Sequence, residues 1–568
     1  MPTQHRGLLL RLLDRTASWL IGFPPERCNF TTCGVRIPIS SGLSRIELAA
    51  DLLQPTLADG TKPLGTVLIR SPYGRGLAIG ITPRAYAARG YQVLFVSCRG
   101  TFGSGGEFDA FRTEGEDGKA VMEWMRAQPW YTGTFATCGG SYLGFVQWAL
   151  LCDDEPPADL VAAVPGVAPH DFARATWGTG ALDLDIVRFA DMVGHQEEPF
   201  APWQAVTGSR KRRFEAVLHS HSVSLAPNLR TYLGEKSPWV DNMLAKPDIR
   251  DPHYAPMRLQ RALERTETPI LIITGWYDLF LQQSMEQYMR LRERGCNVAL
   301  TVGPWTHMKS AVAAPMNRQA FDWIEQHLGG STQAQRTAAV QYFVTGAQEW
   351  RNIAEYPPPT TPSTFHLHPG GELSNEPIST EAEPASSTFT FDPQDPTPTI
   401  GGNGLHLGGS VNDTALARRS DVLVFDTAPL EADLEFCGQP LVALAHSTNS
   451  RFANIFVRVS EVNAKGQSRN VTEAFARLDA QRGEASDDRL SLALNHCSHR
   501  FERGTRIRVV VAGGNFPQYA RNCGVENGGD EDSDMCAVEH TVRYCGPGGS
   551  NIVFPVVEAH EEGSEIAV

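Results

Sequence analysis

Strand-like and helix-like segments alternate between residues 65 and 168, and this alternation restricts the possible folds more than any other feature of the chain. Short apolar segments typical of buried strands are found at 65–70, 91–98 and 134–138. Segments with apolar residues at helical spacing accompany them, at 82–90, 117–130 and 142–152. Strands that alternate with helices in this way predict a parallel sheet of the α/β class.

The alternation stops after residue 168 and resumes at 269 with the strand-like "PILIITG". The sequence between these points is mostly helical, which indicates an insertion. From about residue 339, short alternating strands follow one another between Gly, Pro and Asn turns, as in a β-sandwich or jelly roll. Because 568 residues exceed what one hydrophobic core usually supports, we expect several domains. Their predicted limits are 1–168 and 266–335 for an α/β domain in two parts, 169–265 for the helical insertion and 336–568 for the β-domain.

The net charge and the cysteines of the chain limit which partners the protein is expected to bind and in which cellular compartment it is expected. A formal net charge of -14 leaves little to neutralise phosphates, so we expect no nucleic-acid partner. Eleven cysteines are scattered along the chain, and none forms a set with metal-ligand spacing. Reduced structural thiols and a cytoplasmic location are therefore expected.

The first 23 residues contain a leucine-rich segment that charged residues interrupt. Arg11, Asp14 and Arg15 make it too broken for the core of a signal peptide, and it is too short to span a membrane. We expect a short amphipathic helix here and no membrane partner.

A serine lies in a glycine-rich turn between a predicted strand and a predicted helix. The segment Gly139-Gly140-Ser141-Tyr142-Leu143-Gly144 resembles a nucleophile elbow, with its second glycine one position later than in G-x-S-x-G. An elbow needs small residues because the chain turns sharply and leaves no room for side chains. Ser141 is thus a candidate nucleophile, and the alternative is an ordinary loop serine.

Two possible partners of Ser141 follow in the order Ser, Asp, His that α/β-hydrolases use. Asp278 comes just after the strand-like "ILIIT", and His307 comes just after "VALTV". The carboxyl ends of parallel strands are where such a sheet places its reactive groups. Taken singly, Asp278 is equally explained as a helix cap and His307 as a structural histidine.

With these residues the chain resembles the cocaine esterase and X-prolyl dipeptidyl peptidase family, also called CocE/NonD hydrolases. The matching segments run from about residue 35 to 555 and include "RSPYGRG", "GGSYLG", "GWYDLF", "GPWTH" and "GGNFPQYARN". The resemblance implies an α/β-hydrolase fold with an inserted helical cap and a C-terminal β jelly roll. It also implies that Ser141, Asp278 and His307 are the catalytic residues of an enzyme that needs no cofactor.

The resemblance further implies an oxyanion hole. In this family a tyrosine hydroxyl and the backbone N–H after the nucleophile hold the developing negative charge. These groups correspond here to Tyr73, in "SPYG", and to the amide of Tyr142. A partly buried structural tyrosine is the alternative for Tyr73.

The sequence says less about the substrate. Members of the family that cleave α-amino acid esters hold the substrate ammonium with acids close after the catalytic aspartate, whereas Asp278 is followed by "LFLQ". Phe280 occupies a position at which an esterase of the family presents an apolar wall, and Trp177 could form the opposite wall or pack within the cap. These features favour an ester with an apolar or aromatic acyl group.

The resulting hypothesis is a serine esterase that acts on a small-molecule ester through an acyl-enzyme. The alternatives are acyl transfer in natural-product biosynthesis from the same intermediate, an X-prolyl or α-amino-acyl peptidase or esterase, and a non-catalytic binding protein. We expect no metal, because "HSH" at 219 and "HLH" at 366 each offer two ligands without a third. A homodimer is compatible with the sequence but is not required by it.

Overall fold

The structure is a computed structural model of the 568-residue chain. It describes residues 3–41, 44–77, 79–153, 155–199, 204, 207–220, 225–331, 336–378, 385–405, 408–478, 489–525, 535–544 and 549–558. Contacts divide the chain into two compact units. The first comprises residues 1–178, 186–218 and 226–339, and the second comprises 179–185, 219–225 and 340–568.

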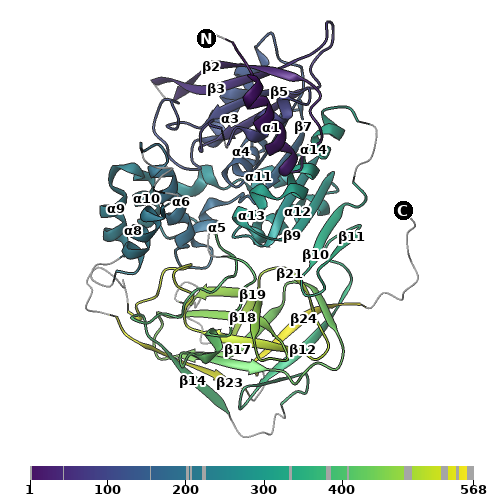
Figure 1. Cartoon of the computed structure of the whole chain (residues 1–568). Coiled ribbons are helices and arrows are strands. Elements are labelled where there is room, and N and C mark those ends of the chain that lie inside the picture. The colour runs from purple at the N-terminus through teal and green to yellow at the C-terminus, as the bar shows by residue number, and fades with distance from the viewer. Residues whose placement is uncertain are drawn as a thin grey trace. The chain divides into compact units, whose positions relative to one another are not determined.

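The first unit contains a largely parallel sheet, drawn in purple to teal in Figure 1. Its strands follow the order β1-β2-β3-β5-β4-β6-β7-β8-β9. Their bounds are β1 Gln4–His5, β2 Asn29–Ser41, β3 Ser44–Thr56, β4 Thr66–Ser71, β5 Gln92–Ser97, β6 Phe135–Gly140, β7 Leu160–Gly166, β8 Ile270–Tyr277 and β9 Val298–Thr306. All pairs from β5–β4 to β8–β9 are parallel, whereas β1, β2 and β3 join the edge in antiparallel fashion.

Helices pack on this sheet because its central strands are buried along their whole length and must be covered on both faces. One set consists of α2 Ile81–Ala87 and α14 Ala314–His327, which share an apolar core with the sheet, and of α1 Leu8–Leu20, which packs against α2. The other set consists of α3 Glu114–Arg126, α4 Tyr142–Leu151, α11 Gln260–Arg265 and α12 Leu281–Glu293. A short helix, α13 His307–Val312, follows β9 directly.

The described part of the chain between β7 and β8 is mostly helical, as the sequence predicted. Its elements are α5 Phe172–Trp177, α6 Leu184–His195, α8 Ser209–Leu218, α9 Leu225–Leu233, η1 Gly234–Lys236, α10 Pro238–Leu244 and η2 Pro252–Met257, followed by α11. Aromatic contacts hold the group together: Tyr232 of α9 lies against His195 and Phe214, and Trp239 of α10 lies against Phe189. Figure 1 shows α6, α8, α9 and α10 as one cluster.

The second unit is built mainly from antiparallel strands, with one large apolar core and a smaller apolar cluster. Its main sheet has the order β14-β23-β17-β24-β12-β13-β15-β22-β18-β19, with β16, β20 and β21 paired to it outside this path. The bounds are β10 Val340–Val344, β11 Glu349–Ile353, β12 Thr360–His368, β13 Glu372–Ser374, β14 Ser386–Phe391, β15 Val422–Asp426, β16 Leu434–Gly438, β17 Leu441–Thr448, β18 Asn454–Val462, β19 Ser468–Arg477, β20 Arg489–Ala493, β21 Cys497–Phe501, β22 Arg506–Ala512, β23 Val538–Arg543 and β24 Asn551–Val557, with the short helix η3 at Leu416–Arg418. Most neighbouring strands are not consecutive in the sequence, as in the jelly rolls that the sequence suggested.

Candidate active site

Ser141 occupies the sharp turn between β6 and α4. Its backbone has φ 59° and ψ -125°, a conformation that residues other than glycine rarely adopt. The Ser141 amide donates a hydrogen bond of 2.8 Å to the carbonyl of Gly166 on β7, which fixes the turn to the neighbouring strand. A strained, tethered serine at the end of a strand is the geometry of a nucleophile elbow.

The glycines around Ser141 are required by close packing. A Cβ on Gly144 would lie 2.4 Å from the Cβ of Ala168, closer than two carbon atoms can approach. Gly139 has φ 143°, and a Cβ there would lie 2.5 Å from Leu143. The turn therefore has this form because its neighbours leave no room for side chains.

His307 and Asp278 converge on Ser141 from two other strand ends. His307 is the first residue of α13, and its Nε2 lies 2.9 Å from the Ser141 Oγ. Its Nδ1 lies 2.6 Å from Oδ2 of Asp278, which follows β8. Because a carboxylate only accepts, Nδ1 donates to Asp278, and Nε2 is left to accept from the serine hydroxyl.

Asp278 is held in place by the chain around it. The side chain is fully buried, and its Oδ1 accepts a hydrogen bond of 2.7 Å from the amide of Phe280. His307 is also buried. A buried acid that orients an imidazole toward a serine hydroxyl is the arrangement that makes a serine nucleophilic.

Tyr73 faces the same point from the loop after β4. Its hydroxyl forms hydrogen bonds with the Ser141 side chain and with the backbone of Tyr142. Burial raises the pKa of the Tyr73 phenol well above its usual value, so the group remains a donor. The loop is braced in turn, because the Tyr73 amide donates to Ser71 Oγ at 3.1 Å and Gln196 Nε2 donates to the Pro72 carbonyl at 2.8 Å.

Comparisons with known proteins find similar chains. The family profile of X-Pro dipeptidyl-peptidase (S15 family) matches residues 42–309, and that of the X-Pro dipeptidyl-peptidase C-terminal non-catalytic domain matches residues 332–547. Cocaine esterase of Rhodococcus sp. is 28% identical over 92% of this chain and 98% of its own length. The chain thus contains the two domains of the X-Pro dipeptidyl-peptidase type, the S15 domain and the C-terminal non-catalytic domain.

Solved structures support the fold class of this hydrolase. An aminopeptidase from a marine sediment archaeon, Thaumarchaeota archaeon, superposes with a TM-score of 0.77 at 21% identity, over 93% of this chain and 97% of its own. An α-amino acid ester hydrolase gives a TM-score of 0.76 at 20% identity, over 93% and 96%. The predicted α/β-hydrolase fold with a helical cap and a C-terminal jelly roll is confirmed, and the chain is a member of a family of serine hydrolases.

A buried polar network lies beneath the nucleophile turn of this hydrolase. The Tyr142 hydroxyl donates to Glu114 Oε1 at 2.7 Å and accepts from the Phe111 amide at 3.0 Å. Glu114 Oε2 pairs with Arg70, whose Nη1 also donates to the Glu114 carbonyl at 2.8 Å. Burial raises the pKa of Glu114, and the guanidinium of Arg70 opposes this rise. The network thus fixes the side chain of Tyr142, whose backbone amide lies beside Ser141.

Sequence reasoning missed this network, although one signal was present. Arg70 ends the apolar segment "GTVLIR", and an arginine in a strand that is buried on both faces must have a charged partner. The sequence could not identify that partner, because Glu114 lies 44 residues further along the chain.

The two predicted substrate-contacting residues lie in different surroundings. The Phe280 ring stands edge-on to the His307 ring, with centroids 5.5 Å apart. Trp177 is buried in the helical insertion, where its indole N–H donates to the Tyr254 hydroxyl at 3.1 Å. No ring contact joins Trp177 to Phe280 among the described residues. The structure thus brings Phe280 to the triad and gives Trp177 a packing partner in the cap.

The described part of the chain contains no group of three or more His, Cys, Asp and Glu side chains arranged to hold a metal ion. Of the two histidine pairs that the sequence singled out, His219, His366 and His368 are described, whereas His221 lies outside the described residues. None of the described helices is long and apolar enough to cross a lipid bilayer.

Proposed function

We propose that this protein hydrolyses a carboxylic ester with an apolar or aromatic acyl group, through an acyl-enzyme on Ser141. The observation that carries the proposal is the hydrogen-bonded series Ser141–His307–Asp278, with distances of 2.9 and 2.6 Å, facing the hydroxyl of Tyr73. This arrangement supplies a nucleophile, a general base, an orienting acid and an oxyanion donor at one point.

The chemistry follows from the positions of these groups. His307 Nε2 accepts the Ser141 proton as Oγ attacks the ester carbonyl, and Asp278 stabilises the resulting imidazolium. The Tyr73 hydroxyl and the Tyr142 amide donate to the oxyanion. His307 then protonates the leaving alcohol, and in the second half-reaction it deprotonates the water that releases the acid.

The preference for an apolar acyl group rests on the surroundings of His307. The Phe280 ring lies perpendicular to the imidazole with centroids 5.5 Å apart, so an acyl group bound at Ser141 meets an aromatic side chain on this side. The acyl group is therefore held by packing, which suits a pocket with few polar groups. Trp177 is assigned to cap packing in this proposal because its indole N–H is already paired with Tyr254.

An aminoacyl substrate is the second candidate, and one structural observation favours it. The carboxylate of Glu197, in the helical insertion, accepts a hydrogen bond of 2.9 Å from the Phe102 amide. Phe102 packs under Gly74, the residue after Tyr73. An acid held against the oxyanion loop could attract a substrate ammonium, and the relatives include an aminopeptidase and an α-amino acid ester hydrolase.

Two experiments test these proposals. A fluorophosphonate probe is expected to label the native protein and not the Ser141→Ala variant; labelling that persists in the variant would show that another residue is the nucleophile. Rates on aryl and alkyl esters of benzoic and aliphatic acids are then compared with rates on amino-acid esters and p-nitroanilides. Faster turnover of the amino-acid substrates, with a selective loss in Glu197→Gln, would favour the second candidate. Product analysis with added alcohols or amines distinguishes hydrolysis from acyl transfer.

A further inference from the structure

Helix α1 is amphipathic in the opposite sense to an ordinary surface helix. Its buried residues are Asp14 and Ser18, which are polar. Its large apolar side chains face outward, with 55% to 75% of their surface exposed. They are Leu8, Leu9, Leu12, Leu13, Trp19 and Leu20. A helix in a globular protein normally turns such a stripe toward the core, so the exposed stripe needs an explanation.

Ion pairs hold α1 in this orientation. Asp14 Oδ1 accepts from Arg84 Nε of α2 at 2.7 Å, and Asp14 Oδ2 lies 3.5 Å from Arg6 Nη1. Arg6 also pairs with Glu26 at 2.9 Å. Rotating the helix to bury its leucines would expose these groups and break their pairs. The outward direction of the stripe is therefore built into the packing of the polar face.

The apolar surface continues beyond α1. Leu77 and Ile79, in the loop before α2, are 69% and 42% exposed. Arg84 joins this loop to the helix, because its Nη2 donates to the Leu77 carbonyl at 2.6 Å while its Nε binds Asp14. Eight of the twelve most exposed large apolar side chains among the described residues belong to α1 and this loop. Surface apolar residues are usually scattered singly, whereas a gathered patch of this kind marks an interaction site.

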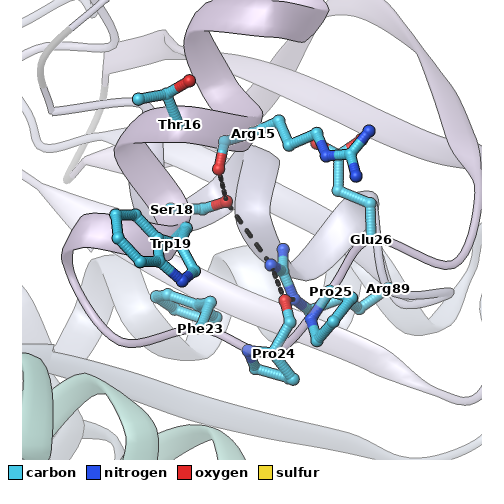
Figure 2. Close-up of a pocket in the computed structure, with 9 residues that line it drawn as sticks. All are labelled: Arg15, Thr16, Ser18, Trp19, Phe23, Pro24, Pro25, Glu26 and Arg89. Carbon is cyan, nitrogen blue, oxygen red and sulfur yellow. Dashed lines mark hydrogen bonds between the residues drawn. The ribbon is translucent and has the colours of Figure 1, made fainter.

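A pocket of about 280 Å³ opens beside the C-terminal half of α1 (Figure 2). Trp19, Phe23, Pro24 and Pro25 supply its apolar walls. Figure 2 shows Ser18 directed toward Arg89, with which it forms a hydrogen bond of 3.4 Å. The pocket thus extends the apolar surface of the stripe next to Trp19.

The charges around the stripe are mainly positive, although the whole protein carries a net charge of -14. Arg11 and Arg15 are exposed on the helix, and its one acidic residue, Asp14, is buried. Arg11 lies 3.8 Å from Glu26, which Arg6 already neutralises. The helix therefore presents an apolar face with a basic margin, which complements phosphate groups above an apolar layer.

A second copy of the chain fits this surface less well. Pairing two copies of α1 through their stripes would bring Arg11 and Arg15 near their own counterparts, and like charges would then repel each other across the contact. A lipid surface avoids this repulsion, because it supplies an apolar layer for the stripe and phosphates for the arginines along the whole helix.

We propose that α1 lies in the plane of a phospholipid surface and holds the protein there. The leucines and Trp19 enter the boundary between headgroups and acyl chains, and Arg11 and Arg15 remain at the phosphates. This differs from the absence of a membrane partner that the sequence suggested, because interrupting charges prevent a helix from spanning a bilayer but not from lying on it.

Vesicle flotation with the full-length protein tests this proposal. The wild type is expected to float with vesicles of equimolar phosphatidylcholine and phosphatidylglycerol. The double variant Leu9→Gln/Leu13→Gln is expected to partition roughly tenfold more weakly or worse. Leu441→Gln is the matched control, because Leu441 is an exposed leucine on β17, 54% exposed against 56% for Leu13, and it is expected to float as the wild type does.

Each other outcome overturns the proposal. A wild type that stays in the aqueous fraction, or a double variant that floats as well as the control, contradicts lipid binding by α1. A wild-type dimer in light scattering that the double variant dissociates, without flotation, would assign the stripe to a second copy. All three proteins are expected to hydrolyse a water-soluble ester equally well, which shows that the variants are folded and keeps this test independent of the proposed substrate.

Discussion

Removing the Tyr73 hydroxyl tests the proposed oxyanion site most directly. The hydroxyl contacts both the nucleophile and the Tyr142 backbone, so Tyr73→Phe removes one of two donors and leaves the Ser141–His307–Asp278 hydrogen bonds in place. Loss of one oxyanion donor costs about 3 kcal/mol of transition-state stabilisation. At about 1.4 kcal/mol for each factor of ten, kcat is expected to fall roughly 150-fold.

The assay measures kcat and KM for an aryl ester of a hydrophobic acid at neutral pH. Because the hydroxyl acts on charge that exists only in the transition state, kcat and kcat/KM should fall together while KM changes little. Tyr131→Phe is the control, since the Tyr131 hydroxyl bonds Asp159 at 2.6 Å and does not contact the triad. A decrease below about tenfold in Tyr73→Phe, or an equal loss in the control, would refute the assignment of Tyr73.

Three further predictions concern the triad, the elbow and the response to acid. Asp278→Asn should lower kcat by about 10³–10⁴, because His307 loses the acceptor that fixes its tautomer. Steady-state kinetics check this, provided that the fluorophosphonate probe still reaches Ser141 in the variant. Gly144→Ala should lower the melting temperature and the rate together, because its Cβ would lie 2.4 Å from that of Ala168; calorimetry that shows no change would contradict the packing argument. Burial lowers the pKa of His170 to about 4 in the folded protein. Between about pH 6.5 and about pH 4 the unfolded chain therefore binds more protons than the folded protein does. The free energy of unfolding falls as the pH decreases through that window, by up to about 3 kcal/mol. Melting temperatures at pH 7 and pH 5 should therefore differ less in His170→Gln than in the wild type.

Much of the fold could be predicted because its signals are local. The strand expected at 65–70 is observed at Thr66–Ser71, and the strand expected at 269–275 begins at Ile270. Their apolar composition follows from burial on both faces of a parallel sheet. The same rule locates the triad, because Asp278 and His307 follow strands whose carboxyl ends meet at one edge of the sheet.

The features that could not be predicted depend on contacts between distant residues. The sequence predicted an amphipathic helix near the N-terminus, but it could not show that Arg84 would pair with Asp14 and turn the apolar face outward. The sequence left Trp177 between a wall of the acyl pocket and packing in the cap, and it could not show that its indole N–H would pair with Tyr254, 77 residues away. Spacing along the chain contains no information on which of two compatible partners a side chain will meet.

Tyr142 serves the site through both its backbone and its side chain, and this limits how the enzyme can change. Its amide faces the Tyr73 hydroxyl, while its own hydroxyl is tied to Glu114 in the interior. Variants at position 142 or 114 would thus alter stability and rate at once. Phe280 touches the imidazole only through its ring, so a laboratory selection for new acyl groups should accumulate substitutions around residue 280 and leave residues 73, 114 and 142 as they are.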